Sequence, residues 1–208
     1  MYSYLRYIII ILCSLSFAGL EITGVPSHIK KNIEQRINYK IRPKYLTYNE
    51  QLLDQLTRET IEAIKPYGYF NPSVSISSDI ESPSNIIINI SLNQLTHLKH
   101  IHLEYTTPPT SDLNDSLQQV VSSYDFSAFS TENINDIIDA VKFSAYQAGY
   151  YDILISRGST VVNKATNSAS LTIMVTPNDM NRFGEIILPK GASPKCFKRY
   201  HNIASGDK

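Results

Sequence analysis

The sequence predicts an α+β protein built from tandem copies of a small β-α-α-β-β unit, in which two helices cover one face of a three-stranded sheet. Two observations carry this prediction. One pattern occurs twice, so that Gly68 and Gly149 stand 81 positions apart (149 − 68). Before each glycine, apolar residues recur every three or four positions, and after it they alternate with polar ones, which indicates a helix followed by strands.

A helix is expected before each glycine, because the same offset aligns two apolar stripes. The stripes are Leu53, Leu56, Thr60, Ile64 and Tyr67 in the first copy and Ile134, Ile137, Val141, Ala145 and Ala148 in the second. Thr47 and Glu50 fit a capping box at the start of the first helix, and Ser130 fits an N-cap for the second. Each glycine can close its helix in the left-handed conformation.

Aromatic pairs follow both glycines and lead into strands. The repeat is therefore marked by Gly68, Tyr69 and Phe70 and by Gly149, Tyr150 and Tyr151. These rings could form a stacking site, but their place between a helix and a strand favours packing. The remaining elements are expected as strands over 20–25, 73–80, 85–92, 98–105, 153–162 and 169–175, and as helices over 26–38 and 111–124.

The ends of the chain indicate export and an unfinished copy. Residues 1–18 fit a secretory signal peptide, with Arg6 before an apolar run that ends in Ser16-Phe17-Ala18, and an uncleaved anchor is the alternative. The first domain is expected over 19–95 and the second over 96–178. Residues 179–208 fit only the first strand and first helix of a third copy. We therefore expect the chain to be a fragment of a longer protein or the product of a truncated gene.

Composition and motifs argue for a binding protein without enzymatic activity. The formal net charge is zero, which disfavours a nucleic-acid partner. No catalytic motif, phosphate-binding loop or cofactor fingerprint occurs, so no catalytic residue and no cofactor is predicted. His100, His102 and Glu104 alternate onto one strand face and could bind zinc, but an ordinary solvated face is the favoured interpretation, and no metal site is predicted.

The order of these features resembles POTRA domains, and within them the TamA-like family. The resemblance rests on the strand at 20–25 directly after the signal, on the end of the first unit over 63–70, and on Arg182-Phe183-Gly184 with Gly206-Asp207 at the third. It implies a periplasmic part of an outer-membrane protein that assembles other outer-membrane proteins, autotransporters among them. It also implies a TamB-like partner anchored in the inner membrane. Attachment to a membrane would come only through a C-terminal β-barrel, which this sequence lacks.

In such domains the resemblance implies that the second strand lies at a sheet edge. An extended client or partner segment could then pair with its free backbone groups, a mode called strand addition. The expected partner-binding residues are Ser73, Val74, Ser75, Ile76 and Ser77 in the first copy and Ile153, Leu154, Ile155 and Ser156 in the second. The alternation of serines with Val74 and Ile76 predicts a polar outer face and a buried inner one. An idle, solvated edge is the alternative.

Two other functions remain open at this point. The same fold could serve as the POTRA part of a two-partner secretion transporter. A protein of another class, a periplasmic metal- or ligand-binding protein, could use the histidine strand.

Overall fold

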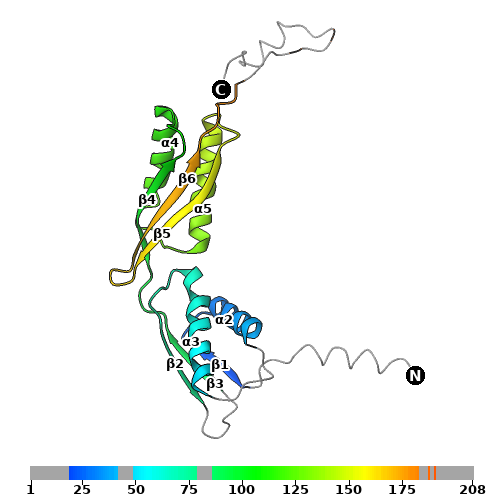
Figure 1. Ribbon diagram of the computed structural model, residues 1–208, viewed down its shortest axis with the longest axis vertical. Coiled ribbons are helices and arrows are strands. Elements are labelled where there is room, and N and C mark those ends of the chain that lie inside the picture. The colour runs from blue at the N-terminus through cyan, green and yellow to red at the C-terminus, as the bar shows by residue number, and fades with distance from the viewer. Residues whose placement is uncertain (1–18, 42–48, 79–85, 183–186, 188–189, 191–208) are drawn as a thin grey trace, which may run out of the picture. The chain divides into compact units, whose positions relative to one another are not determined.

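A computed structural model describes residues 19–41, 49–78, 86–182, 187 and 190 (Figure 1). The predicted signal peptide at 1–18 lies outside the described residues, and so does nearly all of the predicted third copy. The chain divides into two units between Thr96 and His97. Within the described ranges, no helix has both the length and the apolar character needed to cross a membrane.

The first unit has a three-stranded sheet with its last strand in the middle. Its elements are β1 (Leu20–Thr23), α2 (Ser27–Lys40), α3 (Glu50–Ile64), the 3-10 turn η2 (Lys65–Tyr67), β2 (Ser73–Ser78) and β3 (Ile86–Ser91). The strand order is β1-β3-β2. The central β3 pairs parallel with β1 and antiparallel with β2. Both β1 and β2 are therefore edge strands.

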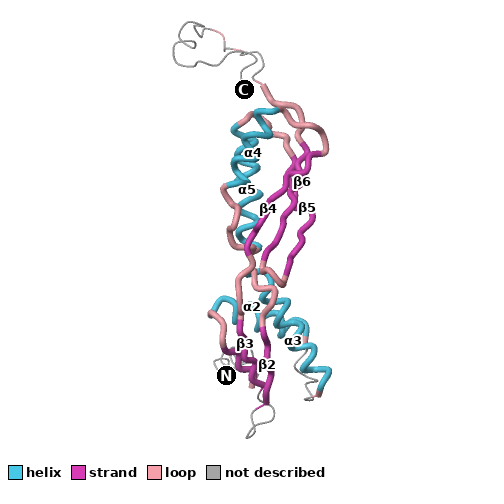
Figure 2. The backbone as a smooth tube through the Cα atoms, turned by 90° about the vertical axis from the view of Figure 1, so that its left-hand side faces the viewer, coloured by secondary structure: helices cyan, strands magenta, loops and turns pink. Residues whose placement is uncertain are grey.

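The second unit repeats this topology with longer strands. Its elements are β4 (His97–Tyr105), α4 (Ser111–Ser122), α5 (Thr131–Gln147), β5 (Leu154–Asn163) and β6 (Ser168–Thr176). The central β6 pairs parallel with β4 and antiparallel with β5. In each unit both helices lie on one side of the sheet (Figure 2). The α+β fold class and the repeated β-α-α-β-β order are thus confirmed.

The helices α3 and α5 both begin at polar caps, although the cap residue predicted for α3 was wrong. The side chain of Ser130 accepts a hydrogen bond from the backbone N–H of Asn133, as expected. The helix α3 begins at Glu50, so its cap is Asn49, whose Oδ1 accepts from the N–H of Leu52 at 2.8 Å. The predicted cap, Thr47, lies outside the described residues, and the residue directly before the first helical turn is Asn49.

Each unit closes its own apolar core between sheet and helices. In the first unit the isoleucines of β3 that face the helices, Ile88 among them, pack with Ile33 of α2 and Leu56 of α3. The buried position at the start of α3 is Leu52, and Leu53 is only half-buried. In the second unit, residues of β6 such as Leu171 and residues of the apolar stripe of α5 such as Ile137 are fully buried. This burial is the main stabilising term for each unit.

A repeated pair of hydrogen bonds fixes the segment that leaves each unit, and we call it the exit clasp. In the first unit, Asn93 Nδ2 donates to the carbonyl of Asn71 at 2.7 Å, and the N–H of Thr96 donates to the carbonyl of Gly68 at 2.9 Å.

The second unit repeats both bonds. Asn178 Nδ2 donates to the carbonyl of Asp152 at 2.5 Å, and the N–H of Asn181 donates to the carbonyl of Gly149 at 2.9 Å. The acceptors are 81 positions apart, whereas the donors are 85 apart (178 − 93), because the hairpin of the second unit is four residues longer. The exit clasp is therefore a property of the fold and not of the hairpin length.

Candidate functional site

One of the two edge strands of the first sheet is β2, which contains all five binding residues predicted for this copy. Ser73, Ser75 and Ser77 are exposed, while Val74 and Ile76 are half-buried and pack against the core of the first unit. The strand pairs with β3 residue by residue from Ser73 to Ser78, without a shift in register. Its outward backbone groups thus form a regular row.

A shallow depression of about 290 Å³ lies over the start of this strand pair. It is lined by Ser73, Val74, Ser75, Asn89, Ile90 and Ser91. Asn93, which has a φ of 56°, closes this end of the hairpin. Its Nδ2 reaches Ser73 Oγ at 3.1 Å, and its Oδ1 accepts from Ser91 Oγ at 3.0 Å. The exit clasp of the first unit therefore also holds the first residue of β2 in place.

The corresponding edge of the second sheet is β5, and it differs in geometry. Leu154 is exposed at 64%, Ile155 is half-buried and Ser156 is exposed. Ile153 precedes the strand and is buried, so its assignment to the strand was wrong. Its side chain fills the core where the chain enters the sheet.

A bulge interrupts β5 in the middle. Arg157 pairs with Ile173 and Thr160 pairs with Leu171, so Gly158 and Ser159 together oppose one residue of β6. The Ser159 hydroxyl donates to Thr172 Oγ1 at 3.1 Å. A glycine within a strand pattern is a known sign of a bulge, and this signal was present in the sequence but unused.

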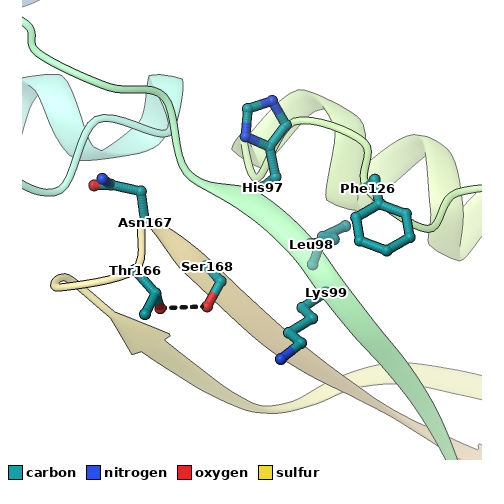
Figure 3. Close-up of a pocket in the computed structure, with 7 residues that line it drawn as sticks. All are labelled: His97, Leu98, Lys99, Phe126, Thr166, Asn167 and Ser168. Atoms are coloured by element: carbon teal, nitrogen blue, oxygen red, sulfur yellow. Dashed lines mark hydrogen bonds between the residues drawn. The ribbon is translucent and has the colours of Figure 1, made fainter.

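A second depression, of about 470 Å³, lies where β4 begins in the second unit (Figure 3). It is lined by His97, Leu98, Lys99, Phe126, Thr166, Asn167 and Ser168. Phe126 is 72% exposed and has a φ of 62°. Its N–H donates to the carbonyl of Leu98, and the N–H of Leu98 donates to the carbonyl of Ser127, both at 2.8 Å. These bonds cover the free edge of β4 at its start.

The three side chains of β4 that were considered as zinc ligands lie on the open face of the second sheet. His100, His102 and Glu104 are exposed and stand beside Ser170, Thr172 and Met174 of β6. Across the part of the chain that the structure describes, no group of three or more histidine, cysteine, aspartate or glutamate side chains is placed to hold a metal ion.

The repeat markers have different surroundings in the two units. Gly68 and Gly149 have φ values of 90° and 89°, which glycine adopts without strain and which end the helices as predicted. Tyr150 is buried, and its hydroxyl lies 2.9 Å from Thr110 Oγ1.

The other aromatic markers are more accessible. Tyr69 and Phe70 are half-buried. Tyr151 is 60% exposed, and its ring lies 5.9 Å from that of Tyr146. The first two rings and that of Tyr150 therefore serve packing, and only Tyr151 presents a largely open face.

A family comparison matches the first unit. Residues 19–92 match the model of POTRA domain TamA domain 1, which spans the unit from the start of β1 to just beyond β3. The first unit is a TamA-type POTRA domain. The second unit repeats the order and the sheet topology of this POTRA domain, as well as its exit clasp.

Among solved structures, POTRA domains 3–5 of BamA from Haemophilus influenzae are similar at 14% identity and a TM-score of 0.41, over 92% of this chain and 78% of that one. POTRA domains 1–2 of Omp85 from Anabaena align at 14% identity and a TM-score of 0.41, over 78% and 95%. CdiB from Acinetobacter baumannii aligns at 9% identity and a TM-score of 0.37, over 77% of this chain and 29% of CdiB. No curated protein matches the chain.

Proposed function

We propose that this chain is the periplasmic scaffold of a TamA-like assembly factor for outer-membrane proteins, and that it binds extended clients or a partner by strand addition. The match of residues 19–92 to a TamA POTRA domain is the observation that carries this proposal. The proposed partners are unfolded outer-membrane proteins, autotransporters among them, and a TamB-like protein anchored in the inner membrane. No catalytic step is required of the chain.

The edge strands supply the physical basis for binding. Unpaired backbone N–H and C=O groups along an edge pair with any extended segment that can align with them. Backbone pairing depends little on the client's side chains, which suits a scaffold with many clients. The outward side chains of β2, those of Ser73, Ser75 and Ser77, are exposed, short and uncharged.

The test uses the absence of tryptophan from this sequence. An unfolded eight-stranded outer-membrane barrel that contains tryptophan is diluted from urea into the full chain, and the emission of the client alone is followed. We expect a saturable change in emission. The same barrel already folded in detergent is the control and should give no change, because its strands are paired. An unfolded client that gives no change would overturn the proposal.

Export is tested separately by the mass of the chain recovered from the periplasm. Removal of residues 1–18 predicts a mature chain that begins at Gly19. Recovery of the unprocessed chain in the membrane fraction would favour the anchor alternative.

A further inference from the structure

The two edges at which strand addition was predicted are not equivalent. We propose that strand addition is confined to β2 of the first unit, and that its occupant is an extended client segment in which apolar and small uncharged side chains alternate. This proposal rests on the function proposed above. It assigns no such role to β5.

The strand β2 lacks the features that protect natural edge strands. Folded proteins guard free edges with charged residues, prolines, bulges or very short strands, since an unguarded edge pairs with other chains. Ser73–Ser78 contains neither a charged residue nor a proline, and its pairing with β3 has no bulge. An edge left open in this way is a liability unless pairing is its purpose.

The side chains beside β2 define the chemistry of the occupant. An added strand would place every second side chain next to Val74 and Ile76, which are half-buried on the helix side. Apolar side chains gain by covering them. The intervening side chains would lie beside Ser73, Ser75 and Ser77, where small uncharged groups fit. Along its paired strands the first sheet has one charged residue, Glu21, on the opposite edge strand.

The bulge makes β5 a poor template. Across Gly158 and Ser159 the backbone advances one residue relative to β6, so a regular strand can align with only half of this edge at a time. A Cβ at position 158 would lie 3.0 Å from the carbonyl oxygen of Thr172, a close contact that glycine avoids. The sequence therefore has, at position 158, the residue that this bulge favours.

An inward charge guards β5 as well. Arg157 pairs with Ile173, which belongs to the buried row of β6, so Arg157 stands on the helix side of the edge. Its guanidinium is held there by Thr160, with Nη2 donating to Oγ1 at 3.1 Å. An added strand would bring an apolar side chain against this charge, and inward-pointing charges are a known protection of edges.

The remaining edges are also less suited than β2. The strand β1 has four residues. The strand β4 has a bulge at Lys99, has its first residues covered by the segment around Ser127, and has His102 and Glu104 along its course. Among the four edge strands that the structure describes, β2 is therefore the one best suited to pairing, by elimination as well as by its own regularity.

Disulfide trapping tests the proposal on the full chain. In a background with Cys13→Ser and Cys196→Ser, one cysteine is placed at the exposed outer position Ser75→Cys on β2 or, as the matched site, Ser156→Cys on β5. The probe is a short peptide in which valine and threonine alternate and one residue is cysteine. Two versions with the cysteine at adjacent positions ensure that one of them presents it on the outer face.

We expect roughly tenfold more trapping at position 75 than at position 156, as loss of alignment and of an inward apolar contact predicts. A peptide with proline at its centre should lose the trapping at position 75, because proline cannot donate to a ladder. Deletion of Ser159 together with Arg157→Val should raise trapping at position 156, because the deletion restores one-to-one pairing with β6. Circular dichroism establishes that each variant is folded.

The outcomes separate this proposal from the proposed function. Equal trapping at both sites, abolished by proline, would retain strand addition and overturn its confinement to β2. Trapping at neither site above the proline peptide would overturn strand addition itself. Disulfide-linked dimers of Ser75→Cys that exclude the peptide would assign β2 to pairing between copies of this chain, and would also overturn the proposal.

Discussion

Replacement of Thr60 by valine should stabilise the first unit. Thr60 lies in the C-terminal half of α3 and is fully buried. Within the described part of the chain, its hydroxyl oxygen has no hydrogen-bond partner. The equivalent position of the second unit, 81 residues further on, is Val141, which is also fully buried. The second copy thus already contains the substitution that we propose for the first.

The size of the effect follows from the cost of burying a polar group. A buried hydroxyl without a partner costs about 1–3 kcal/mol relative to its state in water. Valine has nearly the same shape as threonine, so replacing the unpaired hydroxyl by a methyl group should recover this cost at little expense in packing. We expect a gain of about 1–2 kcal/mol in the free energy of unfolding, which raises the Tm of a domain this small by roughly 4–8 °C per kcal/mol.

Amide hydrogen exchange resolves the two units within one chain. Protection of α3 (Glu50–Ile64) should rise in Thr60→Val, while protection of α5 (Thr131–Gln147) should not change. The matched control is Val141→Thr, which should lower protection of α5 by a similar amount. Equal or lower protection of α3 in Thr60→Val would refute the reasoning, because it would mean that the Thr60 hydroxyl is satisfied in solution.

Three further predictions concern single contacts. Loss of the side-chain bond of the exit clasp in Asn93→Ala or Asn178→Ala should lower the free energy of unfolding by about 1 kcal/mol each, measured by urea titration, with the effect confined to its own unit. Burial raises the pKa of the Tyr105 hydroxyl. The contribution of this neutral hydroxyl to stability is therefore complete below about pH 10 and is lost as the pH rises through the higher folded-state pKa. In a titration of Tm against pH, Tyr105→Phe should remove the share of the alkaline loss in Tm that comes from Tyr105. Gly24→Ala should lower the free energy of unfolding by about 3 kcal/mol or more by urea titration, because the φ of Gly24 is +83° and a Cβ there would collide with the carbonyl oxygen of Ile90.

The fold was predictable because its signals are local and repeated. The glycines at 68 and 149 end helices in both copies, and the apolar stripe of α5, Ile137 and Val141 among its residues, is buried as its spacing predicts. The shift of the stripe from Leu53 to Leu52 at the start of α3 could not be predicted, since either leucine continues a helical pattern and only the packed neighbours decide between them.

The features that distinguish the two candidate edges were largely hidden in the sequence. A bulge depends on how two strands align, and the alignment of β5 with β6 is set by residues distant in sequence. Gly158 gave a hint, but nothing near it indicated that Arg157 would face the helix side. The exit clasp was hidden for a similar reason, because its donors and acceptors follow different offsets between the copies.

The contrast between shared cores and different edges is itself an argument about function. Both units share the helix stripe, the glycine and the exit clasp, which hold each small core together. Edge residues make few core contacts, so they are free to differ without loss of the fold. A bulge and an inward arginine on β5, against none on β2, therefore reflect what each edge meets outside its own domain. The difference between a regular, uncharged edge in one unit and a guarded edge in the other supports our proposal that the chain offers one site for pairing rather than two.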